Sequence, residues 1–79
     1  MNKSNQIRIY DFTKKEISTF LDWANFTEDE RTLFLLRSRY YTLEQAAEEM
    51  NISSKTAYRI NKRVKKKIIK VCMEMHNDF

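Results

Sequence analysis

The chain has 79 residues, which suffice for one small domain with a compact core but not for a large one. It contains no Gly and no Pro, so we expect helices joined by short turns of Asn, Ser and Thr. Cys72 is the only cysteine, so an internal disulfide is excluded. No apolar run approaches the roughly 20 residues that span a bilayer. The N-terminus also lacks the apolar stretch of a secretory signal. These properties predict a cytoplasmic, all-α protein.

The net charge of +4 is unevenly distributed along the chain. Residues 1–52 hold seven Lys/Arg against nine Asp/Glu, whereas residues 53–79 hold eight Lys/Arg against two Asp/Glu. A basic segment of this kind is the electrostatic signature of a protein that neutralises phosphates. A solvated, Lys-rich surface without a nucleic-acid partner is the alternative interpretation of the same charges.

Three Ser/Thr-x-x-Glu/Gln capping boxes mark helix starts along the chain. They pair Thr13 with Glu16, Thr27 with Glu30, and Thr42 with Gln45, and Ser53 is the natural N-cap of a fourth helix. The predicted fold is a small four-helix, all-α domain with helices at about residues 13–24, 28–38, 43–50 and 54–75. Residues 1–10 are expected to form either a short extended arm, because residues 7–10 alternate in polarity, or a disordered end.

Apolar residues recur at steps of three or four within each predicted helix, and most of them are expected to form one core. The stripes contain Ile17, Phe20, Leu21 and Ala24; Leu33, Phe34, Leu36 and Tyr40; Leu43, Ala46, Ala47 and Met50; and Ala57, Ile60, Val64, Ile68, Val71 and Met75. Trp23 is also expected in the core, together with Phe20 and Phe26, where the last helix packs on the first.

Residues 42–64, TLEQAAEEMNISSKTAYRINKRV, have the pattern of a helix-turn-helix, in which a short helix supports a second, groove-reading helix. Ala47 supplies the small side chain that two closely crossing helices require. Asn51 stands at the turn, which needs a left-handed backbone that Gly or Asn adopts. The outward positions after the turn are polar or basic, as a face that reads a DNA groove requires. We therefore predict a helix-turn-helix with a long C-terminal recognition helix.

The segment FTEDERTLFLLRSRYYTLEQAAEEMNISSKTAYRINKRVKKKI, residues 26–68, resembles region four of bacterial sigma factors. It shares with that family the order of a capped leading helix, a YTLEE-like support helix, a small turn and a recognition helix that runs into a basic tail. The chain is also similar to small sigma-like regulators of phages and mobile elements in low-GC Gram-positive bacteria, which often have a YDFTKKE-like start and a KKKI end. LuxR-type domains share the pattern as well. The resemblance implies a transcription regulator that binds DNA.

The chain departs from that family in two respects. It resembles only the promoter-reading module, with nothing like the separate domain that a full sigma factor uses to melt DNA. The outward positions of the recognition helix correspond to Ser54, Lys55, Tyr58 and Arg59, and these differ from the Arg, Glu, Arg and Gln that are typical of primary sigma factors. The resemblance thus implies the fold but not recognition of the standard promoter sequence.

The predicted DNA-binding residues combine one candidate for base readout with several for phosphate contact. They are Thr42, Ser54, Lys55, Tyr58, Arg59, Lys62, Arg63 and Lys66. Arg59 can bond both major-groove acceptors of a guanine, with a phosphate contact as the alternative. Tyr58 either packs on a thymine methyl group, binds a phosphate or closes the turn against the preceding helix. Thr42 begins the support helix, whose free amides and dipole favour a phosphate.

The last part of the chain, IIKVCMEM, is apolar on more than one side. Ile69, Cys72 and Met73 fall away from the stripe that ends in Met75, and we predict that they form a homodimer interface. The alternative is a monomer in which the first helix covers both apolar sides.

Sequence-specific binding of double-stranded DNA by a transcription regulator is the leading functional prediction. The rival is a protein-interaction module that docks on RNA polymerase or on a partner transcription factor through the acidic FTEDER segment and the apolar C-terminal sides. A basic amphipathic helix at a membrane surface would leave the helix-turn-helix pattern unexplained. No enzyme, metal site or cofactor is expected, because Cys72 and His76 make at most half a metal site and the chain has no Gly-rich phosphate loop.

Overall fold

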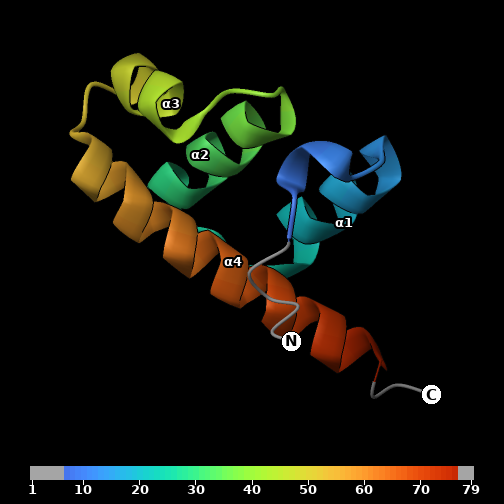
Figure 1. Ribbon diagram of the computed structural model, residues 1–79. Helices are drawn as coiled ribbons and strands as arrows, with labels where there is room; N and C mark the ends of the chain where they lie inside the picture. Colours follow the sequence, from blue (N-terminus) through green and yellow to red (C-terminus); the bar gives the residue numbers. More distant parts are fainter. Residues whose placement is uncertain (1–6, 77–79) are drawn as a thin grey trace.

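The computed structural model describes residues 7–76, which form a short 3-10 helix and four α-helices without any strand (Figure 1). In chain order these are η2 (Ile9–Asp11), α1 (Lys14–Trp23), α2 (Glu28–Ser38), α3 (Leu43–Met50) and α4 (Ser54–His76). The predicted all-α, four-helix fold class is confirmed. Within this part of the chain, no helix combines the length and the apolar character that crossing a membrane would need.

Each of the first three α-helices begins with the capping box that the sequence predicts. The distances from cap hydroxyl to backbone amide are 3.1 Å for Thr13 and Glu16, 3.3 Å for Thr27 and Glu30, and 3.1 Å for Thr42 and Gln45. In all three, the later side chain accepts a hydrogen bond from the amide of the cap residue. Ser53 caps α4 through the amide of Thr56, at 3.1 Å. Such a cap stabilises a helix start by about 1 kcal/mol.

Three turns need a left-handed backbone, and residues other than glycine supply it. They are Asn25 (φ 56°), Tyr40 (φ 71°) and Asn51 (φ 59°). Asn tolerates this region through its short polar side chain, whereas Tyr40 adopts it at a cost of about 1–2 kcal/mol. The amide of Tyr41 donates to the carbonyl of Leu36 at 3.2 Å, so the turn after α2 closes despite that cost.

Phenylalanine side chains build the core where α1, α2 and the segment before α1 meet. Phe34 is fully buried at the centre of this cluster. Its ring centroid lies 5.0 Å from that of Phe26, 6.2 Å from that of Phe20 and 6.4 Å from that of Phe12. Aromatic pairs at these separations stabilise the fold beyond the area that they bury. The cluster therefore connects α1 and α2 into one body.

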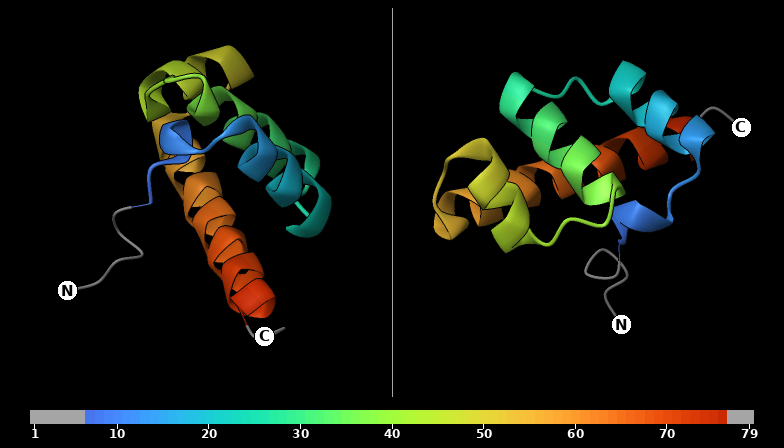
Figure 2. Two further views of the ribbon diagram at one scale, coloured as in Figure 1. Left: turned by 90° about the vertical axis from the view of Figure 1, so that its right-hand side faces the viewer. Right: turned by 90° about the horizontal axis from the view of Figure 1, so that it is seen from above.

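Helix α4 packs on all three of the other α-helices, and one apolar stripe along it provides the contact. The stripe consists of Ala57, Ile60, Val64, Ile68 and Val71, none of which is more than 3% exposed. Seen from above, α4 passes beneath α2 and reaches α1 near its own C-terminal end (Figure 2). The remaining faces of this helix, which is about 35 Å long, are left for solvent or partners.

Ile9 and Tyr10 do not form the extended or disordered arm that the sequence predicts, although Arg8 just before them has an extended backbone. Ile9–Asp11 form the 3-10 helix η2, which packs on α2, and the Ile9 side chain is only 1% exposed. Alternating polarity favours an extended backbone, but burial of Ile9 in the apolar core decides the local structure here. The rest of the predicted arm, residues 1–6, lies outside the described residues.

Three side chains that the sequence assigns to the core are exposed instead: Trp23 (70%), Tyr40 (71%) and Met75 (47%). Trp23 and Ala24 both lie about one turn after Phe20, but α1 buries the small Ala24 and leaves Trp23 outside. Tyr40 occupies the left-handed turn after α2. Met75 lies in the last turn of α4, which extends past the other helices (Figure 1).

Candidate nucleic-acid interface

The predicted helix-turn-helix corresponds to α3, the turn at Asn51 and the first half of α4. Asn51 has φ 59° and ψ 43°, which confirms the left-handed turn expected there. The amide of Ile52 donates to the carbonyl of Ala47 at 3.0 Å, and the amide of Asn51 donates to that of Glu48 at 3.2 Å. These two bonds make a Schellman motif, which fixes the direction in which the chain leaves α3.

Helices α3 and α4 pack on each other, and three of their alanine side chains are buried. Ala46 and Ala57 are fully buried, and Ala47 is 3% exposed. Larger side chains at these positions would separate the two helices, at a cost of about 1–3 kcal/mol for overpacking. The close contact therefore holds the first turns of α4 in a fixed position relative to α3.

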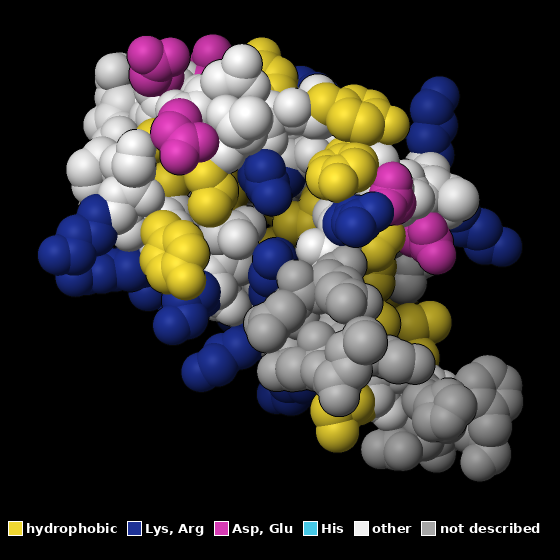
Figure 3. Space-filling view, viewed as in Figure 1, with side chains coloured by type: hydrophobic (Ala, Val, Ile, Leu, Met, Phe, Trp, Pro, Cys, Tyr) yellow, Lys and Arg dark blue, Asp and Glu magenta, His cyan; other side chains and the backbone are white. Residues whose placement is uncertain are grey.

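Exposed basic side chains share the side of α4 that is opposite the buried stripe. Lys55, Arg59, Lys62 and Lys66 follow one another at steps of four, three and four residues. Lys70 extends the series by a further four residues, and this spacing is the signal that would have placed it among the predicted residues. We call these five residues the basic face. Figure 3 shows Lys and Arg side chains gathered along the edge of α4 that lies away from α3.

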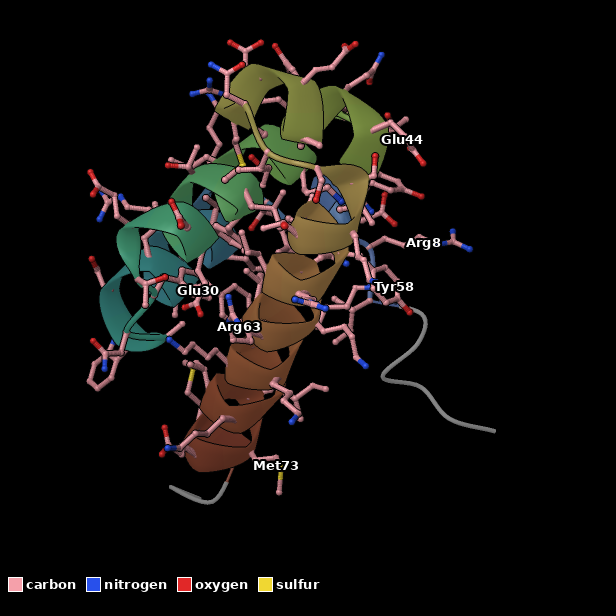
Figure 4. The ribbon with its side chains drawn as sticks, turned by 90° about the vertical axis from the view of Figure 1, so that its left-hand side faces the viewer. Arg8, Glu30, Glu44, Tyr58, Arg63 and Met73 are labelled. Carbon is pink, nitrogen blue, oxygen red and sulfur yellow. The ribbon has the colours of Figure 1, made fainter. Side chains whose placement is uncertain are left out.

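Tyr58 lies beside the basic face and is 57% exposed. The Nζ atom of Lys62 lies 5.9 Å from the centroid of the Tyr58 ring. A cation–π contact at an exposed site contributes about 0.5–1 kcal/mol, so it orients both side chains weakly. Figure 4 shows Tyr58 on the side of α4 opposite Arg63 and Glu30. The ring is therefore accessible rather than packed against α3.

Thr42 and Ser54 stand at the starts of α3 and α4, and both are exposed. The Thr42 hydroxyl is occupied by its capping box with Gln45. Glu44 lies in the first turn of α3, where its carboxylate competes with a phosphate for the positive end of the helix. No acidic residue lies in the first turn of α4. Ser54 is therefore better placed than Thr42 to approach a phosphate.

Arg63 is placed differently from the other predicted contacts, because it is paired with a buried carboxylate. Its Nε atom lies 3.3 Å from Oε2 of Glu30, while Nζ of Lys67 lies 2.6 Å from Oε1 of the same residue. Lys67 also donates to the carbonyl of Asn25 at 2.9 Å. Glu30 is only 2% exposed, so the two cations neutralise a charge buried between α2 and α4. Arg63 therefore lies at the margin of the basic face, toward α2.

The pKa of Glu30 follows from these contacts. Burial alone would raise the pKa. It is outweighed by the hydrogen bonds that Glu30 accepts from Lys67 and from the Thr27 amide, and by the positive charges of Lys67 and Arg63. The pKa of Glu30 therefore lies below its ordinary value of 4.5. The ionised Glu30 carboxylate stabilises the folded protein, and this contribution is complete above pH 4.5. It is lost as the pH falls through the lowered pKa of the folded state, because the unfolded chain binds the proton more readily. We therefore expect Glu30→Gln to be less stable than wild type at neutral pH, with a difference that narrows in acid.

Urea unfolding of both proteins over a series of pH values measures this difference. Glu28→Gln is the matched control, since it removes an exposed carboxylate from the same helical turn. The control is expected to show a small difference with little pH dependence. If the stability difference from wild type narrowed in acid as much for Glu28→Gln as for Glu30→Gln, the assigned role of the buried Glu30 carboxylate would be contradicted.

The outer surface of α3 is acidic, in contrast to the basic face. Glu44, Glu48 and Glu49 are all exposed. In Figure 3, acidic side chains lie over α3 at the top of the molecule, away from the edge where the basic side chains gather. This separation of charge attracts a polyanion to one side and repels it from the other, which sets the orientation of approach.

The residues predicted to form a dimer interface lie near the C-terminal end of α4. Cys72 and Met73 are exposed, and Ile69 is half-buried. Cys72 also lines a surface hollow together with Phe20 of α1. Helix α1 therefore leaves part of this apolar region uncovered.

No group of three or more His, Cys, Asp or Glu side chains in the described part of the chain is arranged to hold a metal ion. No protein-family model matches the chain, no curated protein matches it, and no solved structure matches it.

Proposed function

We propose that the protein is a sequence-specific transcription regulator that binds double-stranded DNA through the major groove, in the manner of sigma factor region four. The observation that carries the proposal is the basic face, a row of exposed cations on a helix that a Schellman turn and close alanine packing hold in place. The major groove of B-DNA admits a single α-helix. The resemblance noted above favours a regulator encoded by a phage or a mobile element.

Members of the basic face have different roles in this proposal. Arg59 reads a base, because its guanidinium can bond N7 and O6 of a guanine together and discriminate by about 1–3 kcal/mol. Lys55, Lys62 and Lys66 contact phosphates on the flanks of the groove, and these contacts position the helix without specifying sequence. Tyr58 lies next to Lys62 and contacts either a thymine methyl group or a phosphate.

Docking on RNA polymerase or a partner transcription factor is a second candidate function. The observation that favours it is the acidic surface of α3, where Tyr40, Glu48 and Glu49 line one hollow. An exposed aromatic ring beside carboxylates suits a protein partner of opposite charge. The two functions are compatible, because this surface lies away from the basic face (Figure 3).

Selection of bound sites from a random duplex library tests the DNA-binding proposal. Wild type is expected to enrich one motif, and Arg59→Ala is expected to lose the preference at one guanine within it. Arg31→Ala is the matched control, because it removes an exposed arginine from α2 and should enrich the same motif as wild type.

The outcomes separate the two candidate functions. Absence of any enriched motif with wild type would contradict sequence-specific binding and leave docking on a protein partner. A motif unchanged in Arg59→Ala would contradict base readout by Arg59. Equal effects of Arg59→Ala and Arg31→Ala would show that charge alone, rather than the basic face, determines binding.

A further inference from the structure

Two cations share one carboxylate between α2 and α4, so the charges of this group are not balanced. Glu30 supplies one negative charge, against the two positive charges of Arg63 and Lys67. The excess positive charge reaches the surface through Arg63, because the side chain of Glu30 is 3% exposed and that of Arg63 is 59% exposed. An exposed positive charge in a fixed position attracts an anion.

Lys67 is the cation that the fold itself uses. Its Nζ atom lies 2.6 Å from Oε1 of Glu30 and donates to the carbonyl of Asn25 at 2.9 Å. The amide of Thr27 donates to the same Oε1 atom at 2.9 Å. Arg63 faces only the other carboxylate oxygen, with its Nε atom 3.3 Å from Oε2. The guanidinium holds further N–H donors on its two Nη atoms in the same plane, so it can face a carboxylate and a second oxyanion together.

Arg63 lies on a flank of α4, beside the basic face rather than at its centre. It follows Arg59 by one turn and lies about 40° further round the helix axis, toward α2. Figure 4 shows Arg63 and Glu30 on one side of α4 and Tyr58 on the other. A helix with its side chains is about 10–12 Å across, which fills a major groove about 12 Å wide. Side chains on the flanks of a helix in the groove therefore meet phosphates, while those at the centre meet base edges.

We propose that Arg63 binds a backbone phosphate on the side of the groove next to α2, and that the buried Glu30 is a positioning residue for this contact. This inference rests on the proposed DNA-binding function. The ion pair with Glu30 restrains the long arginine side chain before DNA arrives, so less side-chain entropy is lost on binding. A buried carboxylate thus strengthens the binding of a polyanion that it does not touch.

The positioning role and the charge of Glu30 predict opposite changes in DNA affinity. As a charge alone, the carboxylate repels phosphates, so its removal would strengthen binding slightly. As a positioning residue, it holds Arg63 in place, so Glu30→Gln is expected to bind duplex DNA about 3- to 5-fold more weakly than wild type. Glu28→Gln is the matched control, since it removes an exposed carboxylate from the same helical turn. The control is expected to bind as tightly as wild type or slightly more tightly.

A double-mutant cycle with Arg63→Ala tests whether Glu30 acts through Arg63. Binding is titrated at several salt concentrations near pH 7, with each variant checked for helical content by circular dichroism. Arg63→Ala is expected to bind about 5- to 10-fold more weakly and to make the salt slope shallower by about 1. In the Arg63→Ala background, Glu30→Gln should weaken binding no further, because no guanidinium remains to be positioned. A purely structural effect of Glu30→Gln would weaken binding equally in both backgrounds.

Arg63→Lys separates charge from geometry and leaves the buried carboxylate in place, so it also serves if Glu30→Gln is too unstable to titrate. Lysine keeps the positive charge and hence the salt slope, but it lacks the planar fork that faces Glu30 and a phosphate together. Arg63→Lys is expected to bind about 3-fold more weakly than wild type. Wild-type affinity in Arg63→Lys would overturn the positioning role. The same holds if Glu30→Gln binds more tightly than wild type, or weakens binding equally with and without Arg63.

The outcomes also separate this inference from the DNA-binding proposal. If wild type does not bind duplex DNA, both fail. If wild type binds, and replacing Lys62 and Lys66 by alanine weakens binding while Arg63→Ala does not, the basic face stands as the DNA-binding surface. In that case only the phosphate contact of Arg63, and with it the positioning role of Glu30, is overturned.

Discussion

Replacing Lys62 and Lys66 together by alanine is expected to weaken binding to duplex DNA by about 30-fold per protomer near physiological salt. Both lysines are exposed on the basic face and one turn apart, so both can reach phosphates on the flank of the same groove. Each phosphate contact releases a condensed counterion, which is the main source of the affinity lost. The slope of log affinity against log salt concentration should therefore become shallower by about 2.

Binding titrations at several salt concentrations measure both quantities. The matched control is Lys14→Ala with Arg31→Ala, which removes two exposed positive charges from α1 and α2 instead. The control should leave the salt slope nearly unchanged, because neither residue belongs to the basic face. A control that loses as much affinity as Lys62→Ala with Lys66→Ala would contradict a localised DNA-binding surface.

Phe34→Ala is expected to cost about 3–5 kcal/mol of the free energy of unfolding. Phe34 is fully buried and its ring lies against those of Phe12, Phe20 and Phe26, so truncation removes contacts on several sides at once. A loss of this size is a large part of the about 5–15 kcal/mol that stabilises a typical protein, and it should lower Tm by about 15–30 °C.

Urea and thermal unfolding followed by circular dichroism measure the effect. Phe34→Leu is the control, because it keeps an apolar side chain at the centre of the cluster and should cost only about 1–2 kcal/mol. If Phe34→Ala loses no more stability than Phe34→Leu, the aromatic cluster does not have the central role in the core that its geometry indicates.

The features that the sequence predicted well are local ones. Capping boxes such as that of Thr27 with Glu30 act over three residues, and the left-handed turn at Asn51 depends on one residue and its neighbours. The common face of Lys55, Arg59 and Lys62 likewise follows from helical spacing alone. Each of these features is determined by residues that lie within a few positions of one another in the sequence.

The features that the sequence predicted wrongly, or gave no sign of, depend on packing between distant segments. Helical spacing allowed either Trp23 or Ala24 to face the core, and only the approach of α1 to the rest of the bundle decides between them. The pairing of Glu30 with Arg63 and Lys67 depends on how α2 lies on α4. Spacing within one helix contains no information on such contacts, so Arg63 could not be separated from the other basic residues.

A single unbroken helix, α4, carries both the buried stripe and the basic face. Because successive residues are rotated by about 100° around the axis, the number of residues between two positions fixes the angle between their side chains, and hence which of the two surfaces each belongs to. One residue inserted after Val64 would turn Lys66 away from Arg59 and, at the same time, move Ile68 out of the core. Changes of composition along α4 are therefore far easier to accommodate than changes of length.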